Sequence, residues 1–489
     1  MIRTRRARLV AVLAASTLVV AACGGDDDDA ADEPTAEEPA DEPTAEEPAD
    51  EPTAQEPADE PTAEEPAEAT AEEPAEMTAE EPAEATAEEP ADATAEEPAE
   101  MTAEEPAEAT AEEPAAEPAD GEPIKIGMLT SLTSNFAPWG LQVQDGMQLA
   151  VDEINAAGGV DGRPLEIVSA DDENNAEAGV SGMERLVEEG VIGIGGVISS
   201  DVGLATSPLA EELEMPTFLV KAGAGGILTQ DSRYVFRTCL PAAPMVSGPI
   251  VQYALDNGLT KVGAIIADYG WGQSIKSALE ADFGETDIEL QVEVAPVPEQ
   301  DFTTYLRNLE TFGPELIVAT GHPPGAAPIT VQSADLGLDV PITGAYSQWS
   351  LTAGGAGEAG IGRYADFDCA DFQSEGYQAL AMRFLAASDL GFMDDDAVAG
   401  FGIVTMLAEA VGEVGDDPVA IAEYLHGATF DLEGYSFQMG WTEWGELATA
   451  QPLFSILGAG PAPEGVNEDG DWYPETLLLP EPLEPYVPE

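Results

Sequence analysis

The segment of residues 124–173 constrains the fold of this chain most, because it alternates a strand, a helix and a second strand. Two apolar runs, residues 124–129 and 165–168, are typical of buried strands. The stretch between them carries apolar side chains at helical spacing: Val143, Met147, Ala150, Val151 and Ile154. Gly158 and Gly159 follow, where the end of a helix needs a positive φ. A βαβ unit of this kind predicts a parallel sheet, with ligands at the carboxyl ends of its strands.

The same alternation of apolar runs and helical patterns continues along the chain in two series. Further strands are predicted within residues 191–197, 217–220, 262–267 and 316–320, and helix-period segments lie between them. Residues 123–489 are also too many for one compact core. We therefore predict an α/β fold with two lobes, each of them a doubly wound βα sheet.

The order of motifs in this region resembles that of a known family. The motifs are IGMLTSLT (126–133), Trp139-Gly140, DGMQLAVDEINAAGGVDGRPLE (145–166) and DDE (171–173). They are similar to those of the ABC-transporter substrate-binding proteins of the branched-chain amino acid and amide family, and the similarity runs through most of residues 124–457. The resemblance implies the type I periplasmic-binding fold, in which two lobes joined by a three-segment hinge close on a small ligand.

The resemblance also divides the folded region into parts. They are lobe 1 (123–238 plus 370–438), lobe 2 (239–369 plus 439–460) and a C-terminal extension (461–489). The extension is rich in proline and has little periodicity, so the sequence assigns it no place in the fold.

The N-terminus has the pattern of a lipoprotein signal peptide over residues 1–22. Four arginines precede an apolar segment, residues 9–20, which is too short for a stable membrane span. The Ala-Ala-Cys sequence ending at Cys23 resembles a bacterial lipobox, which implies cleavage before Cys23, a diacylglycerol on it, and anchoring to the outer face of the cell membrane. The alternative is an ordinary signal peptide with an unmodified cysteine. The Arg-Arg pair leaves the Sec and twin-arginine export routes both open.

Residues 23–122 form an acidic tract of near-identical units such as EPTAEEPAD and MTAEEPAE. Residues 24–122 hold 40 Asp or Glu and no Lys or Arg. Because like charge, proline and alanine leave nothing to bury, we expect a disordered tether that holds the folded region away from the membrane. Binding of cations or of a protein partner by the repeats is the alternative.

The folded region is strongly acidic as well. Residues 123–489 hold 57 acidic and 11 basic side chains, a net charge of −46, which argues against nucleic acid or anionic lipid as a partner. The charge fits an exported protein, and adaptation to high salt is one hypothesis for it. Neither histidine has a metal-ligand spacing, and the chain has no P-loop, G-x-S-x-G or C-x-x-C motif. We therefore expect no enzyme activity, no cofactor and no metal.

Two loops of lobe 1 carry candidate ligand contacts. Ser199 and Ser200 stand between a predicted strand and a helix, where hydroxyl and free N–H groups either cap the helix or receive an anion. In the family, the matching serine loop holds the ligand carboxylate. Gly223 and Ala224 follow the next strand, where the family contacts the ligand through backbone groups and a hydroxyl that Ala224 lacks. A turn without ligand contact is the alternative for this second loop.

Aromatic residues in the loops of both lobes predict an aromatic-walled pocket, which suits a small ligand. Trp139 matches the aromatic residue of an aromatic-glycine pair in the family's first loop. Tyr269 begins a YGWG loop and matches a family tyrosine that faces the ligand. Burial in the core is the alternative for both residues, and it weighs more for Trp271 in the same loop.

Two residues of lobe 2 complete the candidate site. His322 follows a predicted strand, where it either hydrogen-bonds the ligand, with a pKa near about 6.5, or is a loop residue without a role. Tyr346 stands where amino-acid-binding members carry an acidic residue for the ligand ammonium. Since a buried ammonium needs a partner of opposite charge, this difference and Ala224 together argue against a branched-chain amino acid as the ligand.

Cys239 and Cys369 adjoin the first and second crossovers between the lobes, which lie side by side in the family. Export favours oxidation, so the resemblance implies a Cys239–Cys369 disulfide. Two buried free thiols are the alternative.

These features predict an extracytoplasmic solute-binding lipoprotein that acts as a monomer. It would capture an amino acid, an amide, urea or an aromatic carboxylate and deliver it to an ABC permease. The rival hypotheses are a sensor that hands its closed form to a signalling receptor, and a wall-spanning structural protein whose repeat tract is the active part.

Overall fold

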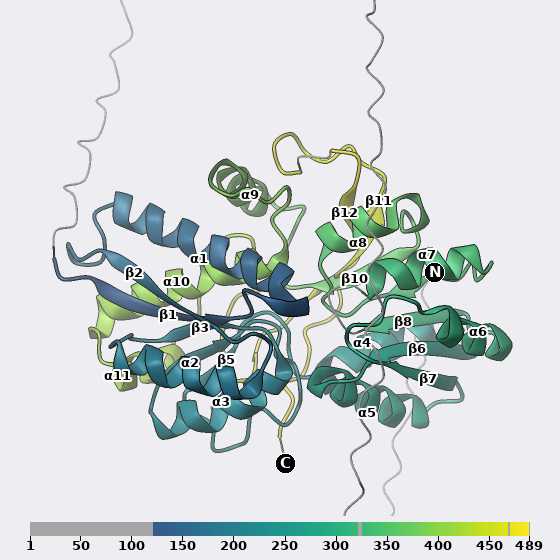
Figure 1. Ribbon diagram of the computed structural model, residues 1–489, viewed down its shortest axis with the longest axis horizontal. Coiled ribbons are helices and arrows are strands. Elements are labelled where there is room, and N and C mark those ends of the chain that lie inside the picture. The colour runs from purple at the N-terminus through teal and green to yellow at the C-terminus, as the bar shows by residue number, and fades with distance from the viewer. Residues whose placement is uncertain (1–120, 321–324, 468–469, 489) are drawn as a thin grey trace, which may run out of the picture. The chain divides into compact units, whose positions relative to one another are not determined.

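The fold is built from two mainly parallel sheets, each with helices packed on it (Figure 1). The computed structural model describes residues 121–320, 325–467 and 470–488. The predicted signal peptide, Cys23 and residues 23–120 of the predicted tether lie outside these ranges, and so does His322.

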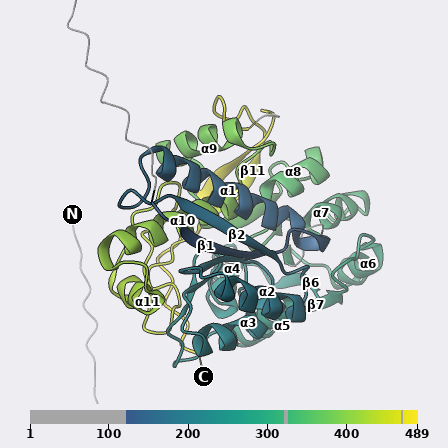
Figure 2. The same ribbon diagram turned by 60° about the vertical axis from the view of Figure 1, so that its left-hand side comes forward.

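The first sheet has five parallel strands in the order β2-β1-β3-β4-β5, which is the order of a doubly wound fold. Its strands are β1 (Ile124–Thr130), β2 (Leu165–Asp171), β3 (Ile194–Val197), β4 (Thr217–Leu219) and β5 (Val235–Arg237). The helices of this lobe are η1 (Ser134–Phe136), α1 (Ala137–Ala156), α2 (Ala176–Glu188), α3 (Ser200–Glu212), α9 (Glu375–Ala387), α10 (Asp395–Val414) and α11 (Pro418–Gly427). Helices α1 and α10 cover one face of the sheet, and α2 and α3 cover the other (Figures 1 and 2).

Among the described residues the second sheet has seven strands in the order β12-β11-β10-β9-β8-β6-β7. Strand β11 is antiparallel to both of its neighbours, β10 and β12, and the other pairs are parallel. Its strands are β6 (Lys261–Ala267), β7 (Glu289–Ala295), β8 (Leu316–Thr320), β9 (Ile342–Thr343), β10 (Tyr364–Asp368), β11 (Leu453–Gly458) and β12 (Tyr473–Leu478). The helices of this lobe are α4 (Ala243–Asp256), α5 (Gly270–Gly284), α6 (Thr303–Phe312), α7 (Ala326–Asp335), α8 (Trp349–Ala356) and η2 (Gly357–Ala359).

Local sequence signals explain where several helices begin and end. The side chain of Asn175 caps α2 by accepting hydrogen bonds from the N–H groups of Glu177 and Ala178. Gly158 and Gly159, just beyond α1, have φ values of 106° and 71°, as predicted from their position. These backbone angles favour glycine, so α1 ends here.

Helix α10 lies at the centre of the first lobe and is buried along most of its length. It packs closely on α1 because each helix presents a glycine to the other. A Cβ on Gly146 of α1 would lie 2.1 Å from the carbonyl oxygen of Ala397, and one on Gly400 of α10 would lie 2.5 Å from that of Val143. The helix is long and apolar enough to span a membrane, but its packing here is that of a core helix.

Three connections join the lobes, and they contact one another. A disulfide links Cys239 of the first connection to Cys369 of the second, which is the pairing that the resemblance implied. The N–H of Ser436, in the third connection, donates to the carbonyl of Cys369 over 2.8 Å. The N–H of Arg237 in turn donates to the carbonyl of Gly445 in the third connection over 3.0 Å. The three segments therefore form one hinge.

The C-terminal extension, which the sequence left unplaced, joins both lobes. Its strand β12 pairs with β11 at one edge of the second sheet. The chain then runs to the third connection, where the carbonyl of Tyr486 accepts from Nε1 of Trp444, a residue predicted in lobe 2 that packs on the core of the first lobe. The carbonyl of Pro488 accepts from Nε2 of Gln230 in the first lobe. Because the side chains that make these hydrogen bonds are far away in the sequence, no local pattern predicts them.

Candidate functional site

A narrow cavity of about 20 Å³ lies between the two lobes. It is lined by residues from the loops and first helical turns that follow strands of both sheets; Trp139, expected in a loop, lies in the first turn of α1. The lining residues are Phe136, Trp139, Ile198, Lys221, Leu240, Tyr269, Trp271, Ala345, Tyr346 and Ser347. This is the side of a parallel sheet on which ligands bind. This volume has room for about one water molecule, so the lobes are closed on each other more tightly than in a typical ligand-filled site.

Aromatic rings form much of the wall and connect the lobes. The ring of Phe136 lies 5.3 Å from that of Trp139 in its own lobe and 5.4 Å from that of Tyr269 across the cleft, in an edge-on arrangement. Trp271 is buried beside Gly223, where a Cβ would lie only 2.5 Å from the indole. Gly223 therefore serves the close packing of the two lobes.

Three buried polar atoms in and beside this cavity have no hydrogen-bond partner among the described residues. They are Nε1 of Trp139, Oη of Tyr346 and Oγ of Ser199. Trp139 and Tyr346 line the cavity, and Ser199 follows the lining residue Ile198. A buried polar group without a partner costs stability, so a ligand that hydrogen-bonds to such an atom would be favoured.

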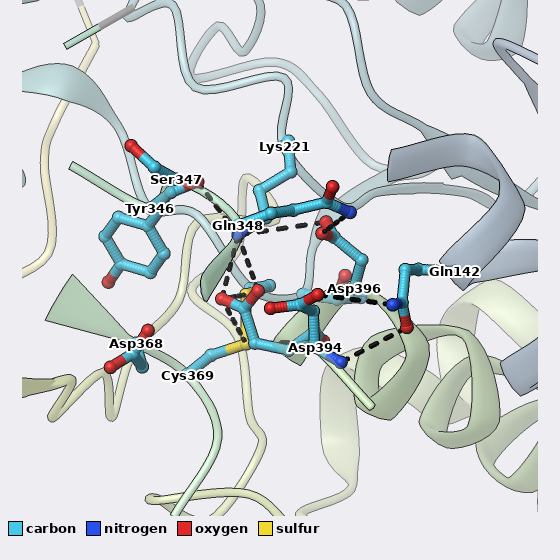
Figure 3. A network of polar contacts seen from close by, with 12 residues as sticks. Gln142, Lys221, Tyr346, Ser347, Gln348, Asp368, Cys369, Asp394 and Asp396 are labelled. Carbon is cyan, nitrogen blue, oxygen red and sulfur yellow. Dashed lines mark hydrogen bonds and ion pairs between the residues drawn. A yellow bond between two sulfur atoms is a disulfide. The ribbon is translucent and has the colours of Figure 1, made fainter. Parts of the chain in front are cut away.

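A buried charge network lies against the same cavity (Figure 3). The ammonium nitrogen of Lys221 lies 2.8 Å from Oδ2 of Asp395, which belongs to the first turn of α10. It also donates to the carbonyl of Tyr346 over 3.2 Å. The network thus joins the loop after β4 to the first turn of α10 and to the opposite lobe.

Further carboxylates surround this ion pair. Asp394 accepts from the N–H of Trp349 over 2.8 Å, and Asp366 accepts from the N–H of Tyr346 over 2.7 Å. Burial raises the pKa of Asp394 to about 7, and burial raises that of Asp366 to about 6, against the hydrogen bonds that lower both. Both carboxyl groups therefore titrate close to neutral pH.

The disulfide also touches this network. Oδ2 of Asp395 lies 3.2 Å from Sγ of Cys239. Because that sulfur is bonded to Cys369, it has no proton to donate and no thiolate to offer a metal ion. The contact is one of packing, and it ties the hinge to the N-terminus of α10.

The raised pKa values predict that acid stabilises the protein between about pH 8 and pH 5. Asp394 has a pKa of 3.8 when unperturbed and about 7 when folded, so the folded state binds more protons between these values. Its contribution to stability is complete below pH 3.8 and is lost as the pH rises through 7. Urea unfolding across this range should show the decline. In an Asp394→Asn variant, this decline of stability with rising pH should be smaller by up to about 1.4 kcal/mol per pH unit. An unchanged slope in the variant would contradict the assignment.

The structure places the sequence-predicted residues in three groups. Trp139, Tyr269 and Tyr346 line the cavity, and Ser199 lies beside it. Ser200, Gly223 and Ala224 lie outside the described lining: Oγ of Ser200 accepts from the N–H of Ala224, and the carbonyl of Gly223 accepts from the N–H of Ala243. His322 belongs to residues that the structure does not describe.

Sequence reasoning missed Lys221 and its partners Asp395 and Asp396. A signal for Lys221 was present, because it is one of few basic residues in a very acidic region and directly follows a strand. The Asp394–Asp396 run reads equally well as the start of a helix, with an N-cap and acidic residues in the first turn. Only the packing of α10 beside the loop after β4 shows the ion pair.

Two α/β lobes that enclose a small cavity at a three-segment hinge define a solute-binding protein of the type I periplasmic fold. The chain belongs to the periplasmic binding protein family, whose sequence pattern matches residues 123–452. The Leu/Ile/Val-binding protein BraC3 of Rhizobium johnstonii is 25% identical over 348 residues, which are 67% of this chain and 94% of that relative. The leucine-, isoleucine-, valine-, threonine- and alanine-binding protein of Pseudomonas aeruginosa is 25% identical over 335 residues, 67% and 87% of the two chains.

Solved structures show the same fold. A solute-binding protein of an ABC transporter from Rhodopseudomonas palustris HaA2, in complex with p-hydroxybenzoic acid, has a TM-score of 0.65 and 19% identity, covering 74% of this chain and 98% of that one. The branched-chain amino acid transporter substrate-binding protein LivJ from Streptococcus pneumoniae, in complex with isoleucine, has a TM-score of 0.63 and 21% identity, covering 73% and 100%. At these identities the comparisons show a shared fold and do not show which ligand this chain binds.

Proposed function

We propose that this chain is an extracytoplasmic solute-binding lipoprotein. It captures a small polar molecule between its lobes and delivers it to an ABC permease. The observation that carries the proposal is that one narrow cavity between the lobes is lined by aromatic side chains with unpartnered polar atoms from both of them, Trp139 from one and Tyr346 from the other. No catalytic step belongs to the proposal, and the lipid anchor is expected at Cys23.

Closure of the lobes is the step that couples binding to delivery. A ligand shifts an open–closed equilibrium only if it contacts the closed form better than the open form, which requires contacts to both lobes. Direct contacts between the lobes already favour closure: the N–H of Gly270 donates to Asp201 over 2.9 Å, and that of Gly225 donates to Ser274 over 2.9 Å. The ligand adds to these contacts by satisfying the polar atoms of the cavity.

The ligands of the relatives indicate the chemical class of the solute. By their names, BraC3 binds leucine, isoleucine and valine, and the Rhodopseudomonas palustris protein was solved with p-hydroxybenzoic acid. An aliphatic or aromatic body next to a carboxylate is common to these ligands. Together with an amide or urea, they make up the class that we propose for this cavity.

Native mass spectrometry of the full chain tests the proposal. As-purified protein is compared with protein that has been unfolded, washed and refolded. A small bound mass that is lost on refolding supports a solute receptor and identifies the solute. A bare protein that also shows no thermal shift with amino acids, amides, urea or aromatic acids would contradict the proposal and favour the structural hypothesis.

Replacing Trp139 by alanine is expected to weaken binding of that solute at least about tenfold, because an aromatic wall and a hydrogen-bond donor are lost together. Isothermal titration calorimetry measures the change. Leu255→Ala, at an exposed position of α4, is the matched control and should bind as the wild type does. Equal affinities for the Trp139 variant and the wild type would place the solute elsewhere.

A further inference from the structure

Lys221 occupies a pocket with the chemistry of an ammonium-binding site. Its Nζ lies 2.8 Å from a carboxylate oxygen of Asp395 and 3.2 Å from the carbonyl oxygen of Tyr346. It also lies 5.2 Å from the centre of the Tyr346 ring. A carboxylate, a carbonyl and an aromatic face are the groups that bind ammonium ions in proteins. Since the lysine side chain is only 5% exposed, its charge is committed to these partners.

Several buried acids maintain the charge of this lysine. Oδ1 of Asp396 lies 3.8 Å from Nζ, and Asp366 faces it from β10. Burial lowers the pKa of Lys221, but the charges of Asp395, Asp396 and Asp366 outweigh burial, so its pKa is raised. The pocket is therefore filled by a permanent ammonium group that belongs to the chain.

The cavity itself offers little to a second ammonium group. Lys221 is the one charged side chain among the described residues that line it, and none of these is Asp or Glu. The unpartnered atoms suit an acceptor instead, because Nε1 of Trp139 can only donate and the hydroxyls of Tyr346 and Ser199 can both donate. A ligand carboxylate can accept from the Trp139 donor in the lining, whereas a ligand ammonium finds no free carboxylate among the described residues there.

We propose that Lys221 stands in for the ammonium group of a ligand, so that the site selects small organic carboxylates that have an apolar or aromatic body and no ammonium group. The lysine determines specificity by occupying the ammonium pocket, so that the carboxylate of Asp395 is not free to bind the ammonium group of a ligand. This inference rests on the proposed function, because it names the class of solute that the receptor takes.

Matched pairs of compounds test the inference on the full wild-type chain. 3-Phenylpropionate is compared with phenylalanine, and 4-methylpentanoate with leucine, since each pair differs by the ammonium group alone. Calorimetry is expected to show binding at least about tenfold tighter for the carboxylates without the ammonium group. Binding of phenylalanine or leucine as tight as that of its counterpart would overturn the inference and leave the proposed function intact.

A lysine variant supplies a test by gain of function. Lys221→Ala should lower the melting temperature, because Asp395 is left buried without its partner. Added ethylammonium should restore part of the loss, and leucine or phenylalanine should now bind more tightly than to the wild type. Lys276→Ala removes an exposed partner of Glu280 and is the control, in which ethylammonium should change nothing. Absence of rescue in a folded Lys221→Ala protein would overturn the inference.

A variant that does not fold, or compounds that do not bind, lead to further measurements that also support or overturn the inference. If Lys221→Ala does not fold, the double variant Lys221→Ala/Asp395→Asn removes both charges, and it should weaken carboxylate binding without any gain for amino acids. If none of the four compounds binds, the solute found by native mass spectrometry decides: an ammonium group in it overturns the inference, and a carboxylate without one supports it. If no solute of any kind binds, the proposed function fails, and the inference fails with it.

Discussion

Replacing Arg237 by methionine is expected to lower the free energy of unfolding by about 3–5 kcal/mol. Arg237 is fully buried at the hinge, where its Nε lies 3.0 Å from Oε2 of Glu446. Its guanidinium also donates to the carbonyls of Ala222 and Ala224. The substitution leaves a carboxylate and two carbonyls buried without this partner, and urea unfolding of the variant and the wild type measures the loss.

A double variant tests whether the lost stability comes from leaving one buried charge unpaired. Burial lowers the pKa of Arg237 and raises that of Glu446, so each charge alone is unfavourable here and the pair largely compensates for its own desolvation. Arg237→Met/Glu446→Met should therefore recover much of the lost stability. Arg307→Met, which removes an exposed ion pair with Glu310, should change stability by less than about 1 kcal/mol. A single Arg237 variant as mild as this control would refute the prediction.

Removing the disulfide with Cys239→Ala/Cys369→Ala is expected to lower the free energy of unfolding by about 2–5 kcal/mol. The bond links residues 130 positions apart, so it restricts the unfolded chain strongly. It also holds the first and second connections of the hinge together beside Asp395. Urea unfolding with and without a reductant gives the comparison.

Two controls accompany this measurement. Reductant should shift the unfolding midpoint of the wild type towards that of the double variant, and it should leave the variant unchanged. A thiol assay on unfolded, unreduced protein should find neither cysteine free. Two titratable thiols, or equal midpoints for reduced and oxidised wild type, would show that the bond does not contribute in solution.

Local patterns predicted much of the architecture. The strand–helix–strand unit at residues 124–173 appears as β1, α1 and β2, because burial of apolar side chains sets the period of each element. Gly158 and Gly159 end α1 with positive φ, since other residues adopt this conformation at a cost. Motifs whose similarity runs through most of residues 124–457 also implied the family, to which the chain belongs.

The candidate site was predicted in part. Trp139, Tyr269 and Tyr346 follow strands whose carboxyl ends face the cleft, so their place could be inferred from topology. Trp271, for which core burial was the stronger alternative, is buried and lines the cavity as well. Ser200 and Ala224 instead hydrogen-bond to each other. The order of the strands does not predict which residues of a loop face the cavity and which face the neighbouring loop.

Although they did not predict α8, α11 or β12, patterns in the sequence were enough to predict the class of fold, most of its strands and helices and the edge of the sheets at which a ligand is expected. These depend on periodicity and turn chemistry, which act between neighbours along the chain. Tertiary structure alone decided the pairing of Lys221 with Asp395, 174 residues away, and the path of the C-terminal extension across both lobes. A buried charge is stable only where its partners converge in space, and convergence over such separations leaves no local pattern in the sequence.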